Sequence, residues 1–430
     1  MAKKQRIILA IFLVCCFGIT NIFSTTGAQA ARIDKKASTL NTIVDQITRQ
    51  VLLNMRANGF NANAKTKGLV TGGLYVNWQM NDPTQTNRLN VSTNDDPPGS
   101  HDSQTDLYYL NSMAEYKYLH PGDSSYDQDI QKISPIVHYE FFNYNLPKGW
   151  IYFYLLRTGL FLNDLTLINE ANMAATNYYN NWYDTNLNLL YNKAHEPGVY
   201  SVEHTITAGA ALIDAGTRWN NPQWLQAGKN TLNIAMAASY NLRAHLFYNN
   251  MSVNDNGTQV VLNDQAKPGT QGSIVEALMD AYTITHTQQY LDIADQVLQS
   301  LLFSSGLWDQ DNGGLYFALD LNSGKLEQKY KETRSQAHTL IGLYRYNQIL
   351  RQLGRQPKYL DKQQQLINLL TGSFYEPNYH GYFYRLTPTF QNYISKNVDG
   401  QPQSENYFTT EAMGIVLDAL QQTEMNIVPF

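Results

Sequence analysis

The sequence predicts an all-α fold in which six helical hairpins close into a ring. The first observation is that apolar residues recur at spacings of three and four, which is the period of an amphipathic helix. The second is that this pattern recurs as six pairs of helices. The first helices are expected near residues 38–57, 126–142, 164–183, 222–241, 288–303 and 356–373, and their partners near 104, 148, 203, 271, 334 and 408. The third observation is the alternation of long and short connections.

The apolar stripes are clearest in the later pairs. Tyr290, Ile293, Ala294 and Val297 form one such stripe on a first helix. Second helices carry three further stripes: Ile274, Ala277, Leu278 and Ala281; Ala337, Leu340, Ile341 and Tyr344; Ala412, Ile415, Val416 and Ala419. The helices beginning at Trp150 and Thr205 are apolar nearly all round, as burial on every side requires. The second helices are therefore expected to line the inside of the ring.

The connections fall into two classes. Links from a second helix to the next first helix are short, as between Arg218 and Pro222, which suits antiparallel neighbours. Links within a pair are mostly long, and long loops in a helical domain usually serve a function. They should all emerge on one face, where turns such as Gly313-Gly314-Leu315-Tyr316 predict small β-hairpins. A cleft walled by loops is expected there.

The N-terminus has the pattern of a secretory signal peptide. Lys3, Lys4 and Arg6 precede an uncharged apolar run over 7–19, and Ala28-Gln29-Ala30 matches a cleavage site. We expect a signal peptide over 1–30, a short exposed segment over 31–37 and a single domain over 38–430. This predicts a protein secreted by a bacterium, either extracellular or associated with the cell wall, with no membrane insertion after cleavage.

Composition narrows the function. Both cysteines lie in the signal, so disulfides and thiolate chemistry are not expected in the mature chain. Removing the signal takes away three of 31 basic residues and none of the 36 acidic ones, which leaves a net charge near −8. An acidic chain without basic clusters argues against nucleic-acid partners. No HExxH, GxSxG or phosphate-binding loop occurs, which argues against the commonest proteases, esterases and nucleotide-binding proteins. We expect no metal and no cofactor, and we expect a monomer.

Aromatic residues gather in the predicted loops. Flat aromatic faces suit sugar rings, although each one could instead brace a loop against the helices. Together with polar neighbours they favour a carbohydrate cleft. The expected substrate-binding residues are Trp78, Trp150, Trp308, Tyr316, Arg334, His338, Tyr382 and Tyr407.

The candidate catalytic residues stand at the starts of second helices. Asp102 and Asp106 are four residues apart and share one helical face, and Glu203-His204 opens another helix. Two carboxyl groups of unequal pKa can act as acid and base, whereas helix capping is the alternative role for Asp102. His204 has the chemistry of an acid or base near neutral pH.

Arg334 is notable because a cation at a helix N-terminus is unfavourable unless it meets an anion or a ligand. It shares a helical face with His338, and Glu332 stands just before it. Glu405 and Glu411 are weaker candidates at the last second helix, and Asp95 and Asp96 form an adjacent pair in a proline-rich loop.

This architecture resembles the (α/α)6 toroid of the six-hairpin glycosidase superfamily. The segment Gln288-Gln289-Tyr290-Leu291-Asp292-Ile293-Ala294 is similar to the outer-helix start YLxxA of that superfamily, and the segment from Trp308-Asp309 to Phe317 is similar to its loops of paired glycines and aromatics. Similar families are glycoside hydrolase families 76 and 88 and the N-acylglucosamine 2-epimerases. The resemblance implies a carbohydrate-active site on the loop face.

The catalytic signatures of these families match only in part. Family 76 enzymes carry adjacent aspartates at a helix start, where this chain has Gln104-Thr105-Asp106. The epimerases use inner-helix histidines, to which His204 and His338 are loosely comparable. The leading hypothesis is a secreted glycoside hydrolase acting on extracellular or cell-wall polysaccharide. The alternatives are a noncatalytic glycan-binding protein and a sugar epimerase.

Overall fold

A computed structural model describes residues 27–66, 69–87, 103–142, 148–191, 198–253, 259–263, 265–396 and 399–425. The chain divides into two units, Met1–Gln46 and Ile47–Phe430. In the first unit the described residues belong to the helix α1, Gly27–Asn54, whose last turns enter the second unit. The predicted signal peptide lies outside the described residues up to position 26, and positions 31–37 are helical. The site lies entirely in the second unit.

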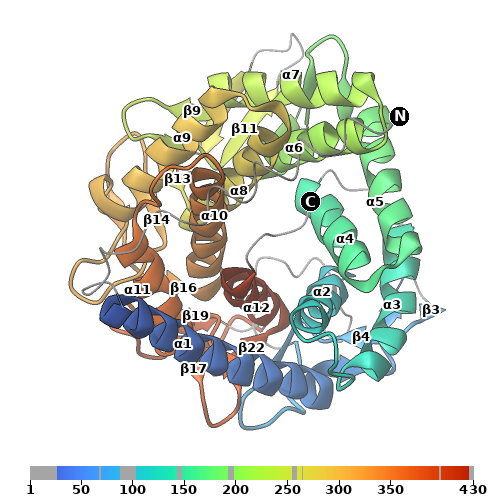
Figure 1. The fold of residues 1–430 in the computed structure, drawn as a ribbon, viewed down its shortest axis with the longest axis vertical. Helices are drawn as coiled ribbons and strands as arrows, with labels where there is room; N and C mark the ends of the chain where they lie inside the picture. Colours follow the sequence, from blue (N-terminus) through green and yellow to red (C-terminus); the bar gives the residue numbers. More distant parts are fainter. Residues whose placement is uncertain are drawn as a thin grey trace, which may run out of the picture. The chain divides into compact units, whose positions relative to one another are not determined.

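The inner helices of the second unit pack side by side in a closed cycle. The pairs α2 with α4, α4 with α6, α6 with α8, α8 with α10, α10 with α12 and α12 with α2 all make contact. Figure 1 shows them around a common centre. The inner helices are α2 (Ser103–Leu119), α4 (Gly149–Leu162), α6 (Val202–Arg218), α8 (Pro268–Thr285), α10 (Thr333–Gln352) and α12 (Thr410–Glu424).

Each outer helix packs mainly against the inner helix that precedes it in the chain, across the short link, and not mainly against the following inner helix with which the sequence analysis paired it. They are α3 (Asp127–Phe142), α5 (Leu165–Asn177), α7 (Pro222–Ser239), α9 (Gln288–Gln299) and α11 (Leu360–Leu370). The prediction of an all-α ring of hairpins, an (α/α)6 toroid, is confirmed. Single π-helical turns follow α1, α5 and α9: η1 (Met55–Gly59), η2 (Tyr178–Trp182) and η3 (Ser300–Ser304). They account for the slightly longer helices expected from the apolar spacing.

Helix starts follow from local chemistry. Asn221 and Asp164 cap α7 and α5 by accepting hydrogen bonds from backbone N–H groups, and Pro222 and Pro268 occupy the first turns of α7 and α8. Ser201 accepts from the His204 backbone N–H and caps α6. These caps fix where each helix enters the ring.

Short antiparallel strands connect the helices. Many stand directly before an inner helix and so position its first turn. The pairs are β1 (Phe60–Asn61) with β4 (Gly73–Leu74), β2 (Lys65–Thr66) with β3 (Leu69–Val70), β5 (Asn77–Gln79) with β22 (Tyr407–Thr409), β6 (Tyr183–Asp184) with β7 (Leu189–Leu190), β9 (Tyr240–Asn241) with β10 (Leu246–Phe247), β16 (Lys331–Glu332) with β19 (Arg385–Leu386), β17 (Tyr375–Glu376) with β18 (Gly381–Tyr382) and β20 (Ile394–Lys396) with β21 (Pro402–Ser404). Two sheets have three strands: β8 (Gly198–Ser201), β11 (Asn250–Val253) and β12 (Gln259–Asn263), and β13 (Gln265–Ala266), β14 (Ala318–Asp320) and β15 (Leu326–Glu327).

Glycines let α8 and α10 approach closely. A Cβ atom on Gly272 would lie 2.5 Å from the carbonyl carbon of His338, too near for any side chain. A Cβ on Gly342 would lie 2.7 Å from the Gly272 carbonyl oxygen. The two backbones are therefore in direct contact, which brings the polar residues of both helices together.

Candidate active site

The N-terminal parts of the six inner helices surround a cavity of about 260 Å³. Every inner helix contributes to its lining, so the predicted convergence of their starts is confirmed. The lining residues are Gln104 and Tyr108; Lys148, Trp150, Phe153 and Tyr154; Glu203, His204 and Thr207; Lys267, Gly269, Thr270, Ser273, Glu276, Ala277 and Asp280; Glu332, Arg334, Ser335 and His338; and Glu411.

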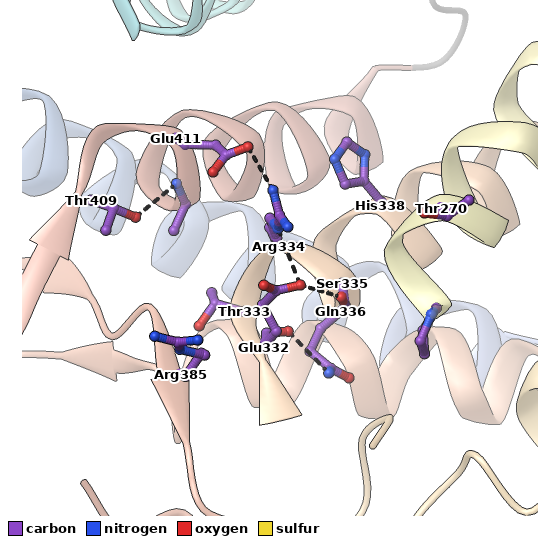
Figure 2. A network of polar contacts seen from close by, with 12 residues as sticks. Thr270, Glu332, Thr333, Arg334, Ser335, Gln336, His338, Arg385, Thr409 and Glu411 are labelled. Carbon is purple, nitrogen blue, oxygen red and sulfur yellow. Dashed lines mark hydrogen bonds and ion pairs between the residues drawn. The ribbon is translucent and has the colours of Figure 1, made fainter. Parts of the chain in front are cut away.

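Arg334 joins two carboxylates from different elements. Its Nη1 donates to Oε1 of Glu411 at 2.9 Å, and its Nε lies 3.1 Å from Oε2 of Glu332. Figure 2 shows Arg334 between these carboxylates, with His338 alongside. Ser335 Oγ also donates to Oε2 of Glu332, at 2.7 Å. The expectation that Arg334 must meet an anion is thus confirmed, and the anions come from the protein itself.

Electrostatics keep Glu332 ionised. Burial opposes the charge, but Arg334 and the Ser335 hydroxyl outweigh it and hold the pKa of the Glu332 carboxyl below its ordinary value. In turn, although burial acts against the charge of Arg334, Glu332 and Glu411 raise the pKa of its guanidinium. This part of the cavity wall is a fixed ionic bridge.

Glu203 stands on the first turn of α6. Its carboxyl accepts a hydrogen bond from Thr270 Oγ1 at 3.4 Å. Burial raises the pKa of Glu203, while Ser273 and Arg334 counteract part of this effect. The pKa of the Glu203 carboxyl therefore lies above its ordinary value.

Glu276 lies one turn beyond Ser273 on the same side of α8, about 4.5 Å further along the helix axis. Its Oε1 lies 3.9 Å from Nη1 of Arg157, whose Nη2 donates to Oδ2 of Asp418 at 2.8 Å. Burial, reinforced by the nearby Asp280 carboxylate, raises the pKa of Glu276 to about 8. At neutral pH this carboxyl carries its proton, which is the state required of a general acid.

Two histidines complete the polar lining. Burial, with the help of Lys148, lowers the pKa of His204 to about 3. Burial and the neighbouring Arg334 guanidinium lower the pKa of His338 to about 4. Both imidazoles are neutral at pH 7, and His338 Nδ1 lies 3.2 Å from Ser273 Oγ.

Three aromatic rings form one wall of the cavity. Tyr108 stacks on Trp150 with ring centroids 5.2 Å apart and planes 11° apart. Tyr154 meets both rings edge-on, at 5.3 and 5.7 Å. Such a rigid apolar face fits the apolar face of a sugar ring.

The structure brings together five residues selected from the sequence. Trp150, Glu203, His204, Arg334 and His338 all line this cavity. They come from α4, α6 and α10 and are far apart in sequence.

Of the other two proposed catalytic residues, only Asp106 is among the described residues, and it does not line the cavity. Asp106 is fully buried outside the cavity lining, and its Oδ1 accepts a hydrogen bond from the Leu74 backbone N–H at 2.8 Å. Its carboxylate thus ties β4 to α2 instead of facing a ligand. Asp102, together with Asp95 and Asp96, lies outside the described residues.

The remaining aromatic candidates also lie away from the cavity lining. Trp78, Trp308, Tyr382 and Tyr407 are each at most 3% exposed, so they pack in the interior instead of offering a platform at the surface. Trp78 meets Phe408 edge-on, with centroids 6.4 Å apart. Tyr316 is half-buried. For these residues the alternative role, bracing of the loops, describes the structure better.

Sequence reasoning missed Glu276. The helix α8 was identified by its apolar stripe, yet Thr270, Ser273, Glu276 and Asp280 form a second, polar stripe at the same helical spacing. A glutamate within an otherwise apolar inner helix was the available signal.

Among the described residues, no helix is long and apolar enough to cross a membrane.

The sequence matches no family model and no curated protein sequence. Solved structures, in contrast, match nearly the whole chain. An unsaturated glucuronyl hydrolase specific for heparin aligns with a TM-score of 0.63 at 11% identity, covering 90% of this chain and 99% of its own. An alpha-1,6-mannanase of glycoside hydrolase family 76 from Salegentibacter sp. HEL1_6 aligns with a TM-score of 0.56 at 12% identity, covering 89% of this chain and 100% of its own. A D-mannose isomerase aligns with a TM-score of 0.59 at 11% identity, covering 88% of this chain and 97% of its own.

These neighbours differ in the activities that their names give, and their identities to this chain are low. What they share with it is the arrangement of the helices. The chain thus has an (α/α)6 toroid fold, which it shares with these solved structures.

Proposed function

We propose that this protein is a secreted glycoside hydrolase that cleaves an extracellular or cell-wall polysaccharide with a pair of carboxyl groups. The observation that carries the proposal is that several carboxyl groups line one cavity, and that burial and Asp280 raise the pKa of one of them, Glu276, to about 8. Cleavage of a glycosidic bond needs one carboxyl group to protonate the leaving oxygen and a second, ionised one to act as base or nucleophile. Export rests on the basic, apolar and small-residue pattern of the first 30 residues.

Glu276 is assigned as the acid and Glu203 as its partner. Both line the cavity, and Ser273, one turn from Glu276 on α8, favours the ionised form of Glu203. Burial raises the pKa of both carboxyl groups, and that of Glu276 reaches about 8 because Asp280 and Asp418 add to the effect. The Thr270 hydroxyl instead donates to Glu203 and favours its ionised form.

The substrate is bound by the aromatic wall of Tyr108, Trp150 and Tyr154. The cavity is smaller than the roughly 300–1,000 Å³ of sites for drug-sized ligands, so it suits a short part of a saccharide. An inactive variant of the family 76 mannanase was solved in complex with alpha-1,6-mannotetrose, which supports a carbohydrate ligand on this fold. The protein is expected to act as a monomer.

The test is a hydrolysis assay. Purified protein is incubated with a panel of bacterial and fungal polysaccharides, and new reducing ends are measured. On the substrate found, Glu276→Gln and Glu203→Gln should each lower turnover by about 10²- to 10⁴-fold. Asp361→Asn, an exposed carboxylate on the outer helix α11, is the matched control and should retain activity. Activity within a few-fold of wild type in both glutamate variants would reject the assignment.

A sugar epimerase or isomerase is the second candidate, because two neutral imidazoles line the cavity. His204 and His338 stay uncharged at pH 7 and could move a proton on a sugar carbon. Incubating monosaccharides with the protein in D₂O separates the two functions. Deuterium bound to sugar carbon without new reducing ends would favour the isomerase, and the reverse result would favour the hydrolase.

A further inference from the structure

A second cavity lies toward the opposite end of the inner helices from the candidate active site. Its volume is about 530 Å³, roughly twice the 260 Å³ of the first cavity. The helices α2, α4, α6, α8 and α10 all contribute to its lining. On α6, Asp214 of this cavity follows Glu203 of the first by eleven residues, which is about 16 Å along a helix axis. We call this second space the far cavity.

Two buried side chains stand between the cavities. Phe153 and Asp280 line both of them, and both residues are buried. All other residues of the far cavity are absent from the lining of the active site. A molecule in the far cavity therefore occupies a site of its own and leaves the active site open.

Two ion pairs from three helices line the far cavity. Arg218 Nε lies 3.1 Å from Asp214 Oδ2, and its Nη2 donates to Asp214 Oδ1 at 3.2 Å. Arg345 Nη2 donates to Asp280 Oδ1. These four are the charged residues of the lining, so two positive charges stand against two negative ones. The far cavity has no excess charge that would attract an ion.

The direction of the helices also disfavours an anion. Arg218 is the last residue of α6, Gln352 is the last residue of α10, and Thr283 lies in the last turn of α8. The C-terminal ends of helices carry partial negative charge, so those around the far cavity repel an anion. A cation would in turn have to approach the two guanidinium groups. A ligand without net charge suits this cavity better than either ion.

The paired groups retain the capacity to bind hydroxyl groups. An ionised carboxylate accepts about four hydrogen bonds, and Asp214 accepts two from Arg218 and one from the Tyr152 hydroxyl. A guanidinium has five N–H groups, of which Arg218 directs two to Asp214. Gln348, which is buried in the same wall, adds an amide. Because a hydroxyl both donates and accepts, adjacent carboxylate and guanidinium groups match a ligand that carries several hydroxyls.

An aromatic pair and an aliphatic side chain form the apolar part of the wall. The rings of Tyr118 and Phe161 have centroids 4.7 Å apart. Tyr118 is 47% exposed and Leu160 is 37% exposed, so this part of the wall reaches the surface. Such side chains suit the C–H face of a sugar ring, whereas the ion pairs suit its hydroxyls.

We propose that the far cavity is a second binding site, specific for a short stretch of an uncharged saccharide. Its volume lies within the roughly 300–1,000 Å³ of sites for small molecules. Binding there does not depend on hydrolysis. If the proposed function holds, the far site would keep a polysaccharide chain close to the enzyme and so raise its effective concentration at the active site. Only this consequence rests on the proposed function.

The experiment follows the methyl group of Met279, which lines the far cavity and not the active site. The full-length protein is labelled with ¹³C at its methionine methyl groups, and Met279→Leu identifies the signal among those of the ten methionines. Three neutral probes are titrated: alpha-1,6-mannotetraose, cellotetraose and xylotetraose. At least one should shift the Met279 signal in a saturable way. Tetragalacturonate, a charged probe of the same length, should bind at least tenfold more weakly.

Two substitutions at exposed positions disable the far site without removing a buried group. Thr283→Trp places an indole in the cavity and should abolish the response of Met279. Tyr118→Ala removes part of the aromatic wall and should weaken binding by about 2- to 10-fold.

Each substitution has a matched control outside both linings. Thr217→Trp changes an exposed threonine on α6, and Tyr379→Ala changes a tyrosine that is 45% exposed. Both controls should keep the wild-type affinity at Met279. Trp150→Ala, in the wall of the active site, should keep it as well.

The far site is refuted if the Met279 signal stays unchanged with all three neutral probes up to their solubility limits. It is also refuted if Thr283→Trp and Tyr118→Ala both keep the wild-type affinity, or if tetragalacturonate binds more tightly than the neutral probes. A Met279 response without hydrolysis of any polysaccharide would reject the proposed function alone. Hydrolysis without a Met279 response would reject the far site alone.

Discussion

Replacing Glu276 by Gln tests the assignment of the acid through two independent measurements. Gln keeps the size and shape of the side chain but has no proton to donate. Turnover should fall by about 10²- to 10⁴-fold, the usual contribution of a positioned general acid. In the wild type the activity should decline as pH rises above about 8, because Glu276 loses its proton there.

Glu276→Gln should raise the stability of the protein, although it lowers turnover. A carboxyl with a raised pKa stabilises the fold fully below its unfolded pKa near 4.5, and this stabilisation is lost as pH rises through about 8. One unit of pKa difference corresponds to about 1.4 kcal/mol. The difference between the unfolded pKa near 4.5 and the folded pKa of about 8 therefore corresponds to a loss of at most about 5 kcal/mol of stability between pH 4 and pH 9. The Gln variant does not ionise, so it should gain stability relative to the wild type by an amount of this order.

Urea unfolding of both proteins at pH 4, 7 and 9 measures this difference directly. All other titrating groups are common to the two proteins, so their contributions largely cancel. A stability difference that is the same at all three pH values would show that Glu276 is ionised in the fold at neutral pH. That result would contradict its role as the acid, whatever the activity of the variant.

Four further substitutions test the site and the core. Trp150→Ala should weaken saccharide binding by about 2- to 10-fold in calorimetry, from the loss of roughly 0.5–1.5 kcal/mol of aromatic contact. Trp308→Ala, at a buried position, should instead cost about 3–5 kcal/mol of stability. If Trp150→Ala and Trp308→Ala weakened saccharide binding equally, the assignment of Trp150 to the binding wall of the cavity would be contradicted. Asp106→Asn should keep turnover within a few-fold of wild type and lower the free energy of unfolding by about 1–3 kcal/mol. A loss of turnover by orders of magnitude would instead show that Asp106 is catalytic. Arg334→Met should destabilise the protein by about 3–5 kcal/mol at pH 7 and by less as pH falls through the lowered pKa of Glu332; unfolding curves without this pH dependence would show that the ionic bridge adds no stability.

The sequence alone determined the architecture. Helical spacing is a local property, and apolar stripes such as Tyr290, Ile293, Ala294 and Val297 specify which face of each helix is buried. Six repeats with alternating short and long connections leave a closed ring as the arrangement that buries all of these faces. The inner helices accordingly begin within three residues of the expected positions, for example at Val202 and Thr333.

The sequence also selected part of the site, for a physical reason. Polar residues at the starts of inner helices must face the cavity once the ring closes, and Glu203, His204, Arg334 and His338 do. Asp106 has the same local signature but bonds to the backbone of β4, a contact between residues 32 positions apart in sequence. Nothing in the spacing of charges distinguishes these two outcomes.

Only the tertiary structure decided which groups share an environment. The protonation of Glu276 depends on Arg157, Asp280 and Asp418, which come from three different helices and meet only inside the ring. The burial of Trp78 and Trp308 likewise depends on strands and loops that fold over them. Burial and charge proximity set pKa values, and both are properties of the packed ring, so the sequence determined the scaffold and the tertiary structure determined its chemistry.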